Sequence, residues 1–121
     1  MRLTNLTCSN GFAVNIGFDY SFQVSIDEED FTGRTFHFVV KESKRNSSSP
    51  ATLVQLTNST DNSVSGVFLS VVTHGIVDIL IKASDSASID PQQAVYEFYY
   101  EIASAKVLLF EGTLEFFDGV V

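Results

Sequence analysis

The sequence predicts an all-β fold: an immunoglobulin-like antiparallel β-sandwich of about seven or eight strands, in a single domain spanning residues 1–121. Three observations predict it. Apolar and polar residues alternate with a period of two in several segments. Turn-forming residues separate these segments at roughly ten-residue spacing. Apart from one short loop, no segment carries a helical pattern, and 121 residues with 45% apolar content suffice for one buried core.

Alternation identifies the first strands. Even positions from Phe18 to Ile26 are apolar or aromatic and odd positions are polar, which predicts a strand with one buried face. An acidic loop over 27–30 and turn chemistry at Thr32-Gly33 lead into a second alternating strand over 34–42. The serine-rich stretch 43–50 that follows is expected to be a mobile loop.

The remaining segments are assigned in the same way. Residues 1–13 are expected to form an N-terminal strand or arm, and residues 51–57 and 63–72 two strands around a polar turn. Residues 75–82 alternate as a half-buried strand. Residues 83–91 have no period of two and are rich in Ser and Asp, which favours a loop with one helical turn.

The last two strands carry the strongest hairpin signal, with Ala103-Ser104-Ala105 as the connection. The residues expected to point inward are Ala94, Tyr96, Phe98, Tyr100 and Ile102, then Leu108, Phe110, Gly112, Leu114 and Phe116. In that register Glu97 faces Glu111, Tyr99 faces Leu109 and Glu101 faces Val107. Val95, Tyr99, Leu109 and Phe117 are then left on the outward side.

This outward side is more apolar than a wetted sheet surface usually is. Apolar patches of more than a few hundred Å² tend to mark partner sites. Two interpretations remain open: a partner subunit covers these residues, or an N-terminal strand over 3–13 of the same chain does.

The pair Glu97 and Glu111 brings two like charges together across the ladder, which is unfavourable by up to about 1 kcal/mol. Such a pair can be a general acid and base, a cation site with Glu115 nearby, or part of a solvated face. We expect the solvated face, because no Gly-rich or basic motif marks a substrate pocket around the pair. No phosphate loop, dinucleotide fingerprint or nucleophile elbow occurs, and we expect no enzymatic activity.

The net charge of −8 argues against binding nucleic acid, because phosphate neutralisation needs a surplus of Lys and Arg. The apolar residues are too evenly spread for a membrane span, so we expect no membrane contact either. Charge is unevenly distributed along the chain. Four basic residues are expected to form a corner that docks on the acidic surface of a neighbouring subunit: Arg34, Lys41, Lys44 and Arg45.

Cofactor and ligand chemistry has little support in the sequence. Cys8 is the only cysteine and is expected to be a buried, inert thiol. His37 and His74 lack the spaced partners of a zinc site, so we expect no metal and no cofactor. Tyr99 could stack on a sugar ring, although a core or interface role is favoured. The first ten residues do not read as a secretory signal, which favours synthesis in a reducing cytosol.

One stretch carries a resemblance. Residues 30–41, Asp-Phe-Thr-Gly-Arg-Thr-Phe-His-Phe-Val-Val-Lys, are similar to a signature of small tail- and baseplate-associated proteins of tailed bacteriophages, including the N-terminal module of siphophage upper baseplate proteins. Later segments follow the same plan: residues 77–82, 84–89, 96–102 and 109–116 match its later strands and loop. Phe31 stands where the family has Leu, and Arg34 where it has an aromatic residue.

The resemblance implies a non-enzymatic virion structural protein, made and assembled in the host cytoplasm. It implies an adaptor or assembly module of the tail or baseplate that binds other phage structural proteins and is a homo-oligomer in the virion. Two alternatives remain open: a capsid decoration, or cement, protein, and a carbohydrate-binding module for host recognition.

Overall fold

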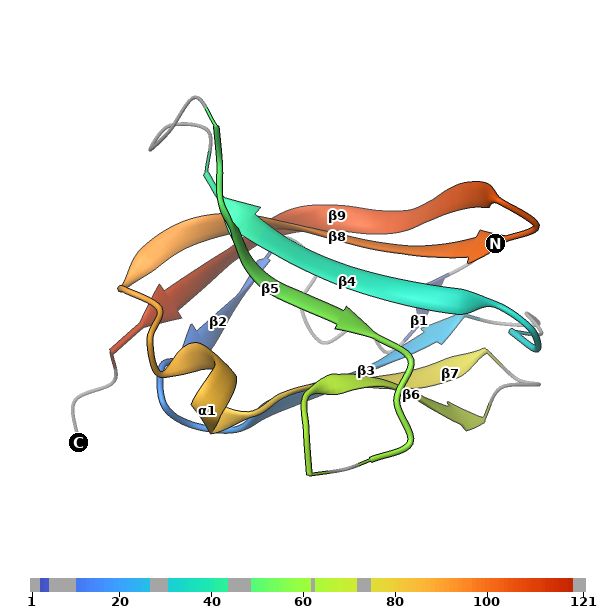
Figure 1. Ribbon diagram of the computed structural model, residues 1–121, viewed down its shortest axis with the longest axis horizontal. Coiled ribbons are helices and arrows are strands. Elements are labelled where there is room, and N and C mark those ends of the chain that lie inside the picture. Colours follow the sequence, from blue (N-terminus) through green and yellow to red (C-terminus); the bar gives the residue numbers. More distant parts are fainter. Residues whose placement is uncertain are drawn as a thin grey trace.

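The computed structural model describes residues 3–4, 11–26, 31–43, 49–61, 63–71 and 75–118. It confirms the predicted all-β fold, with two sheets packed face to face (Figure 1). The four-stranded sheet contains β1 (Leu3–Thr4), β3 (Tyr20–Ile26), β7 (Ile76–Ile81) and β6 (Gly66–Val71). The five-stranded sheet contains β2 (Gly11–Asn15), β9 (Ala105–Phe117), β8 (Gln92–Ile102), β4 (Thr35–Glu42) and β5 (Thr52–Thr57). The one helix in the described part is the single turn α1 (Ala83–Ser86).

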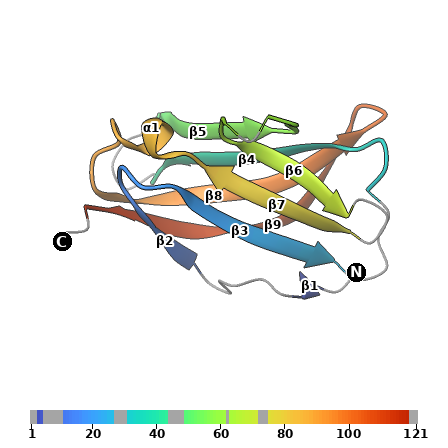
Figure 2. The same cartoon turned by 90° about the horizontal axis from the view of Figure 1, so that it is seen from below.

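The strand order is that of an immunoglobulin-like sandwich. The orders β1-β3-β7-β6 and β2-β9-β8-β4-β5 correspond to strands A-B-E-D on one sheet and G-F-C-C′ on the other, with β2 added beside G. Figure 2 shows β3, β7 and β6 lying across the strands of the larger sheet. Two details differ from the prediction: nine strands are described, and β2 pairs with β9 in parallel, so the sandwich is not wholly antiparallel.

Aromatic side chains fill the space between the sheets. Phe36, Phe38 and Phe98 are fully buried, as the alternation within their strands predicts. Phe36 stacks on Phe98 at 5.4 Å between ring centroids, and Phe31 meets Phe36 edge-on at 4.8 Å. The turn after Phe31 depends on Gly33, whose φ of +79° suits a residue without a β-carbon. Phe18, expected at the start of a strand, is instead 50% exposed in the turn before β3.

The β8–β9 hairpin follows the predicted register only as far as Phe98, which faces Phe110 as expected. The turn contains two residues, Ala103 and Ser104, both with positive φ, which is type I′ geometry. A bulge at Leu109 absorbs the difference, so Tyr99 faces Leu108 in place of Leu109 and Glu101 faces Lys106 in place of Val107.

Several side chains near the hairpin turn point to the opposite side from the one predicted, or are more exposed than predicted. Leu108, expected inside, is 46% exposed, and Ile102 near the turn is 43% exposed. Val107 and Leu109, expected outside, pack partly against the core. A two-residue turn shifts every side chain on the near half of β9 by one position, and the period of two then inverts which face it occupies.

The N-terminal segment extends both sheets at their edges. β1 pairs antiparallel with β3, and β2 pairs with β9, so the described parts of residues 1–13 add strands and do not lie over a sheet face. Most of the loop predicted over 43–50, residues 44–48, lies outside the described residues, as do the acidic loop 27–30, Cys8 and His74.

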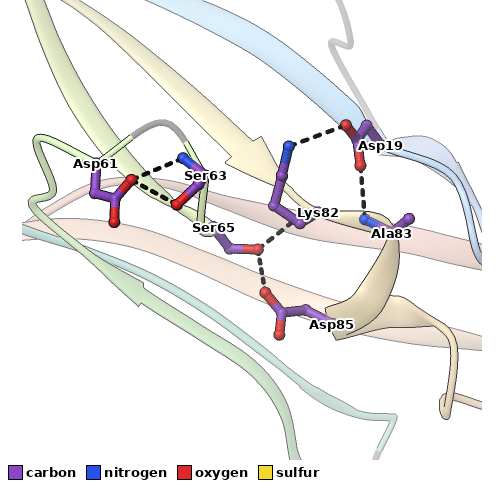
Figure 3. Close-up of polar contacts among 7 residues, drawn as sticks. All are labelled: Asp19, Asp61, Ser63, Ser65, Lys82, Ala83 and Asp85. Carbon is purple, nitrogen blue, oxygen red and sulfur yellow. Dashed lines mark hydrogen bonds and ion pairs between the residues drawn. The ribbon is translucent and has the colours of Figure 1, made fainter.

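The single helical turn α1 confirms the loop prediction for 83–91 and is held by polar contacts from segments distant in the sequence (Figure 3). Asp19 accepts a hydrogen bond from the backbone N–H of Ala83 at 2.8 Å and lies 3.3 Å from Nζ of Lys82. Ser65 joins the same region, because its Oγ accepts from the N–H of Lys82 at 2.7 Å and donates to Asp85. These contacts fasten the start of α1 to the residues just before β3 and β6.

Acid should weaken this junction. The hydrogen bond from the N–H of Ala83 holds the pKa of Asp19 below its ordinary value, and the Lys82 side chain adds a smaller effect in the same direction. The folded state therefore gains stability from Asp19 above the unfolded pKa of about 4, and loses it as pH falls through the lower folded pKa. We expect Asp19→Asn to flatten the fall of stability between about pH 5 and pH 3, as measured by urea unfolding at each pH.

The matched control is Asp90→Asn, because the Asp90 carboxylate makes no hydrogen bond or ion pair with a described residue. Asp61, whose pKa is lowered by hydrogen bonds from Ser63, keeps its own acid sensitivity in both variants. A pH slope equally steep in Asp19→Asn and in the unsubstituted chain would contradict the assignment.

Candidate binding face

The outward side of the five-stranded sheet holds most of the residues that the sequence singled out. We call it the outer face and define it by the outward side chains of β4, β8 and β9, which the pairing registers place on one side. Its members are His37, Val39, Lys41, Val95, Glu97, Tyr99, Glu101, Lys106, Leu108, Glu111, Thr113, Glu115 and Phe117.

Apolar side chains are exposed at three points of the outer face. Val95, Leu108 and Phe117 are exposed to 39%, 46% and 37%. They do not form one continuous patch, because carboxylates stand between them along the strands. Leu108 was missed by sequence reasoning, since only the bulge turns it outward, whereas Leu109, predicted for this face, packs partly against the core.

Tyr99 lies inside a polar network near the hairpin end of the outer face. The His37 ring stacks on Tyr99 at 4.9 Å, and Nζ of Lys106 lies 4.2 Å from the Tyr99 ring centroid. Because β4 and β9 flank β8, these two neighbours approach Tyr99 from opposite sides. A sugar stacking on Tyr99 would have to displace one of them, which weighs against the carbohydrate-binding alternative.

The same network holds the charges around Tyr99. Nε2 of His37 lies 2.7 Å from Oε1 of Glu101 without a directed hydrogen bond, and this contact is an ion pair only with a protonated imidazole. Nζ of Lys106 lies 3.8 Å from Oε1 of Glu97. Both contacts are at the surface, where such pairs stabilise by at most about 1 kcal/mol. They also determine which charged side chains of the outer face remain without an ion-pair partner among the described residues.

A shallow hollow of about 470 Å³ opens in the middle of the outer face. Val39 forms its floor and is only 8% exposed although it points outward. The rest of the lining is Lys41, Val95, Tyr96, Glu97, Glu111, Gly112 and Thr113. Glu97 faces Glu111 across β8 and β9 as the sequence predicted, so two carboxylates stand on one rim of an apolar floor.

The four basic residues predicted to form one corner are not all brought together. Arg34 precedes β4, and its guanidinium lies 4.5 Å from the Tyr100 ring centroid and 5.3 Å from that of Phe31. Lys41 is exposed near the other end of β4, about 23 Å away at strand spacing. Arg34 therefore packs over aromatic rings of the core, as a cation–π contact, and does not share a surface with Lys41. Lys44 and Arg45 lie outside the described residues.

The described residues contain no group of three or more His, Cys, Asp or Glu that could hold a metal ion. A second hollow, of about 670 Å³, is lined by residues 58–61 with Phe68 and Leu69, beside the corner between β5 and β6. None of the described helices is long and apolar enough to cross a membrane.

Comparison with known proteins adds no assignment. No protein-family model matches the chain, and a search of curated proteins finds no match.

Proposed function

We propose that this chain is a non-enzymatic structural protein of a bacteriophage virion, an adaptor or assembly module of the tail or baseplate that binds other virion proteins. The resemblance of residues 30–41 to the phage signature supports it, together with the order of the elements that follow. The signature covers the Gly33 turn and β4, and the later motifs fall on β7, α1, β8 and β9 of one sandwich. An immunoglobulin-like fold alone hosts many functions, so the binding surfaces carry the argument.

The observation that carries the proposal is the outer face. It presents Val95, Leu108 and Phe117 to solvent on a rigid central sheet, while the described N-terminal strands lie at the sheet edges. Of these, Val95 borders the apolar floor at Val39 and charged residues surround both, an arrangement that corresponds to the apolar centre and polar rim of a protein–protein contact. This favours protein partners over the intrachain cover that the sequence left open.

A free sheet edge offers a second route to partners. β5 is the last strand of the larger sheet and has no charged residue and no proline within it. Natural proteins usually protect such an edge with charges, prolines or bulges. β5 has one bulge near its start, at Leu53, because Val40 faces Val54 while Lys41 faces Thr52. The regular part of the edge, residues 54–57, can accept a strand of another protein through main-chain hydrogen bonds. We assign β5 to contacts with other virion proteins.

Immunogold labelling of purified particles, with antibodies against the folded chain, tests the proposal. We expect label at the tail or baseplate and a fixed number of copies per particle by quantitative mass spectrometry. Label spread over the capsid would favour the cement alternative. Particles without the protein would contradict a virion function.

A further inference from the structure

We infer that the outer face binds the same face of a second copy of this chain, with Lys41 of each copy paired to Glu111 of the other. The inference rests on the proposed assembly function and names one of its partners. It concerns the hollow over Val39, where Lys41 stands on the β4 side and Glu111 on the β9 side.

Charge pairing inside the outer face leaves these two groups available. Lys106 contacts Glu97, and His37 contacts Glu101. Neither Lys41 nor Glu111 forms an ion pair with a residue that the structure describes. Lys41 and Glu111, a cation and an anion, thus stand on the rim of the same apolar hollow without an ion pair to a described residue.

The two groups form no ion pair with each other within the described chain. β4 and β9 flank β8 and are therefore about 10 Å apart. Lys41 is level with Val95 and Glu111 is level with Glu97, so the two residues are also offset by about 7 Å along the strands. In a two-fold contact the same patch meets itself, so residue i of one copy reaches residue j of the other and the reverse. Lys41 and Glu111 on one face provide two such pairs at once.

A second copy supplies both complementary charges at this place, its Glu111 for Lys41 and its Lys41 for Glu111. A chain of net charge −8 repels its own copies, so self-association needs a surface where a cation meets an anion. At about 0.15 M salt the more distant charges are screened beyond about 8 Å, whereas close pairs persist. Val95 beside Lys41 and Leu108 near the hairpin end then lose their contact with water in the same packing.

A charge swap tests the pairing. We expect sedimentation equilibrium of the full chain in 0.15 M salt to show a mass rising with concentration from 13.3 kDa toward twice that value. Lys41→Glu and Glu111→Lys should each raise the dimer dissociation constant at least about tenfold, because each puts like charges face to face. The double variant Lys41→Glu/Glu111→Lys restores opposite signs and should return to within about threefold of the original value.

Asp90→Lys is the matched control, since it reverses an exposed acid away from the outer face and should leave the dissociation constant unchanged. Circular dichroism confirms that each variant is folded. A chain that stays monomeric at millimolar concentration overturns the inference, as does a folded double variant that fails to recover. A monomer present in particles overturns only this inference, whereas a dimer absent from particles overturns only the proposed function.

Discussion

Phe36→Ala is expected to lower the free energy of unfolding by about 3–5 kcal/mol. Phe36 is fully buried, and its ring contacts those of Phe31, Phe98 and Tyr100 at centroid distances of 4.8, 5.4 and 5.8 Å. Removal of the ring leaves a cavity that two rigid sheets cannot close. Because domains of this size are stable by about 5–15 kcal/mol, the variant should lose a large share of its stability.

Urea unfolding followed by tyrosine fluorescence measures the effect. Phe117→Ala is the matched control: the same substitution on the outer face, where the ring is 37% exposed, should cost less than about 1 kcal/mol. Equal losses in the two variants would contradict the assignment of Phe36 to the centre of the core.

Asn58→Ala should produce the second large loss, about 1–3 kcal/mol, by releasing the corner after β5 from the start of β4. The Asn58 side chain accepts a hydrogen bond from the N–H of Phe36 at 2.9 Å and donates one to the carbonyl of Arg34 at 3.0 Å. The Asn58 side chain thus provides the hydrogen bonds that a neighbouring strand would otherwise give to the backbone at the start of β4. Alanine leaves one backbone donor and one acceptor without their partners in a half-buried place.

Two further variants make this test specific. Asn58→Asp keeps an acceptor for Phe36 but turns a second acceptor toward the Arg34 carbonyl, so it should recover little of the lost stability. Thr60→Ala, at an exposed position two residues on, should be close to neutral. If Asn58→Ala unfolds at the same urea concentration as Thr60→Ala, the two hydrogen bonds do not stabilise the corner.

Much of the fold follows from the period of two. Alternation from Phe18 onward and over 34–42 located β3 and β4 because one face of each strand is buried and the other solvated. The same rule placed Val77, Ile79 and Ile81 in the core. Alternation cannot locate a bulge, however, since a single extra residue leaves the composition of a strand unchanged. The inversion of Leu108 and Leu109 therefore had no signal in the strand itself.

The turn offered only a weak signal. Ala103 and Ser104 both adopt positive φ, a conformation that sequences usually mark with Asn or Gly. Long-range contacts were equally hidden. Arg34 lies over Tyr100 because β4 and β8 are neighbours, and Asn58 reaches β4 from the end of β5. Neither contact follows from local pattern, so charge alone grouped Arg34 with Lys41 although the structure places them at opposite ends of β4.

Hydroxyl-radical footprinting of the chain, free at dilute concentration and within purified particles, tests most directly the claim that the outer face is the binding surface. The account predicts that Tyr99, Leu108 and Phe117 lose reactivity in particles, whereas Phe18, 50% exposed in the turn between β2 and β3, keeps it. Equal reactivity of the three outer-face residues in both states would contradict the account.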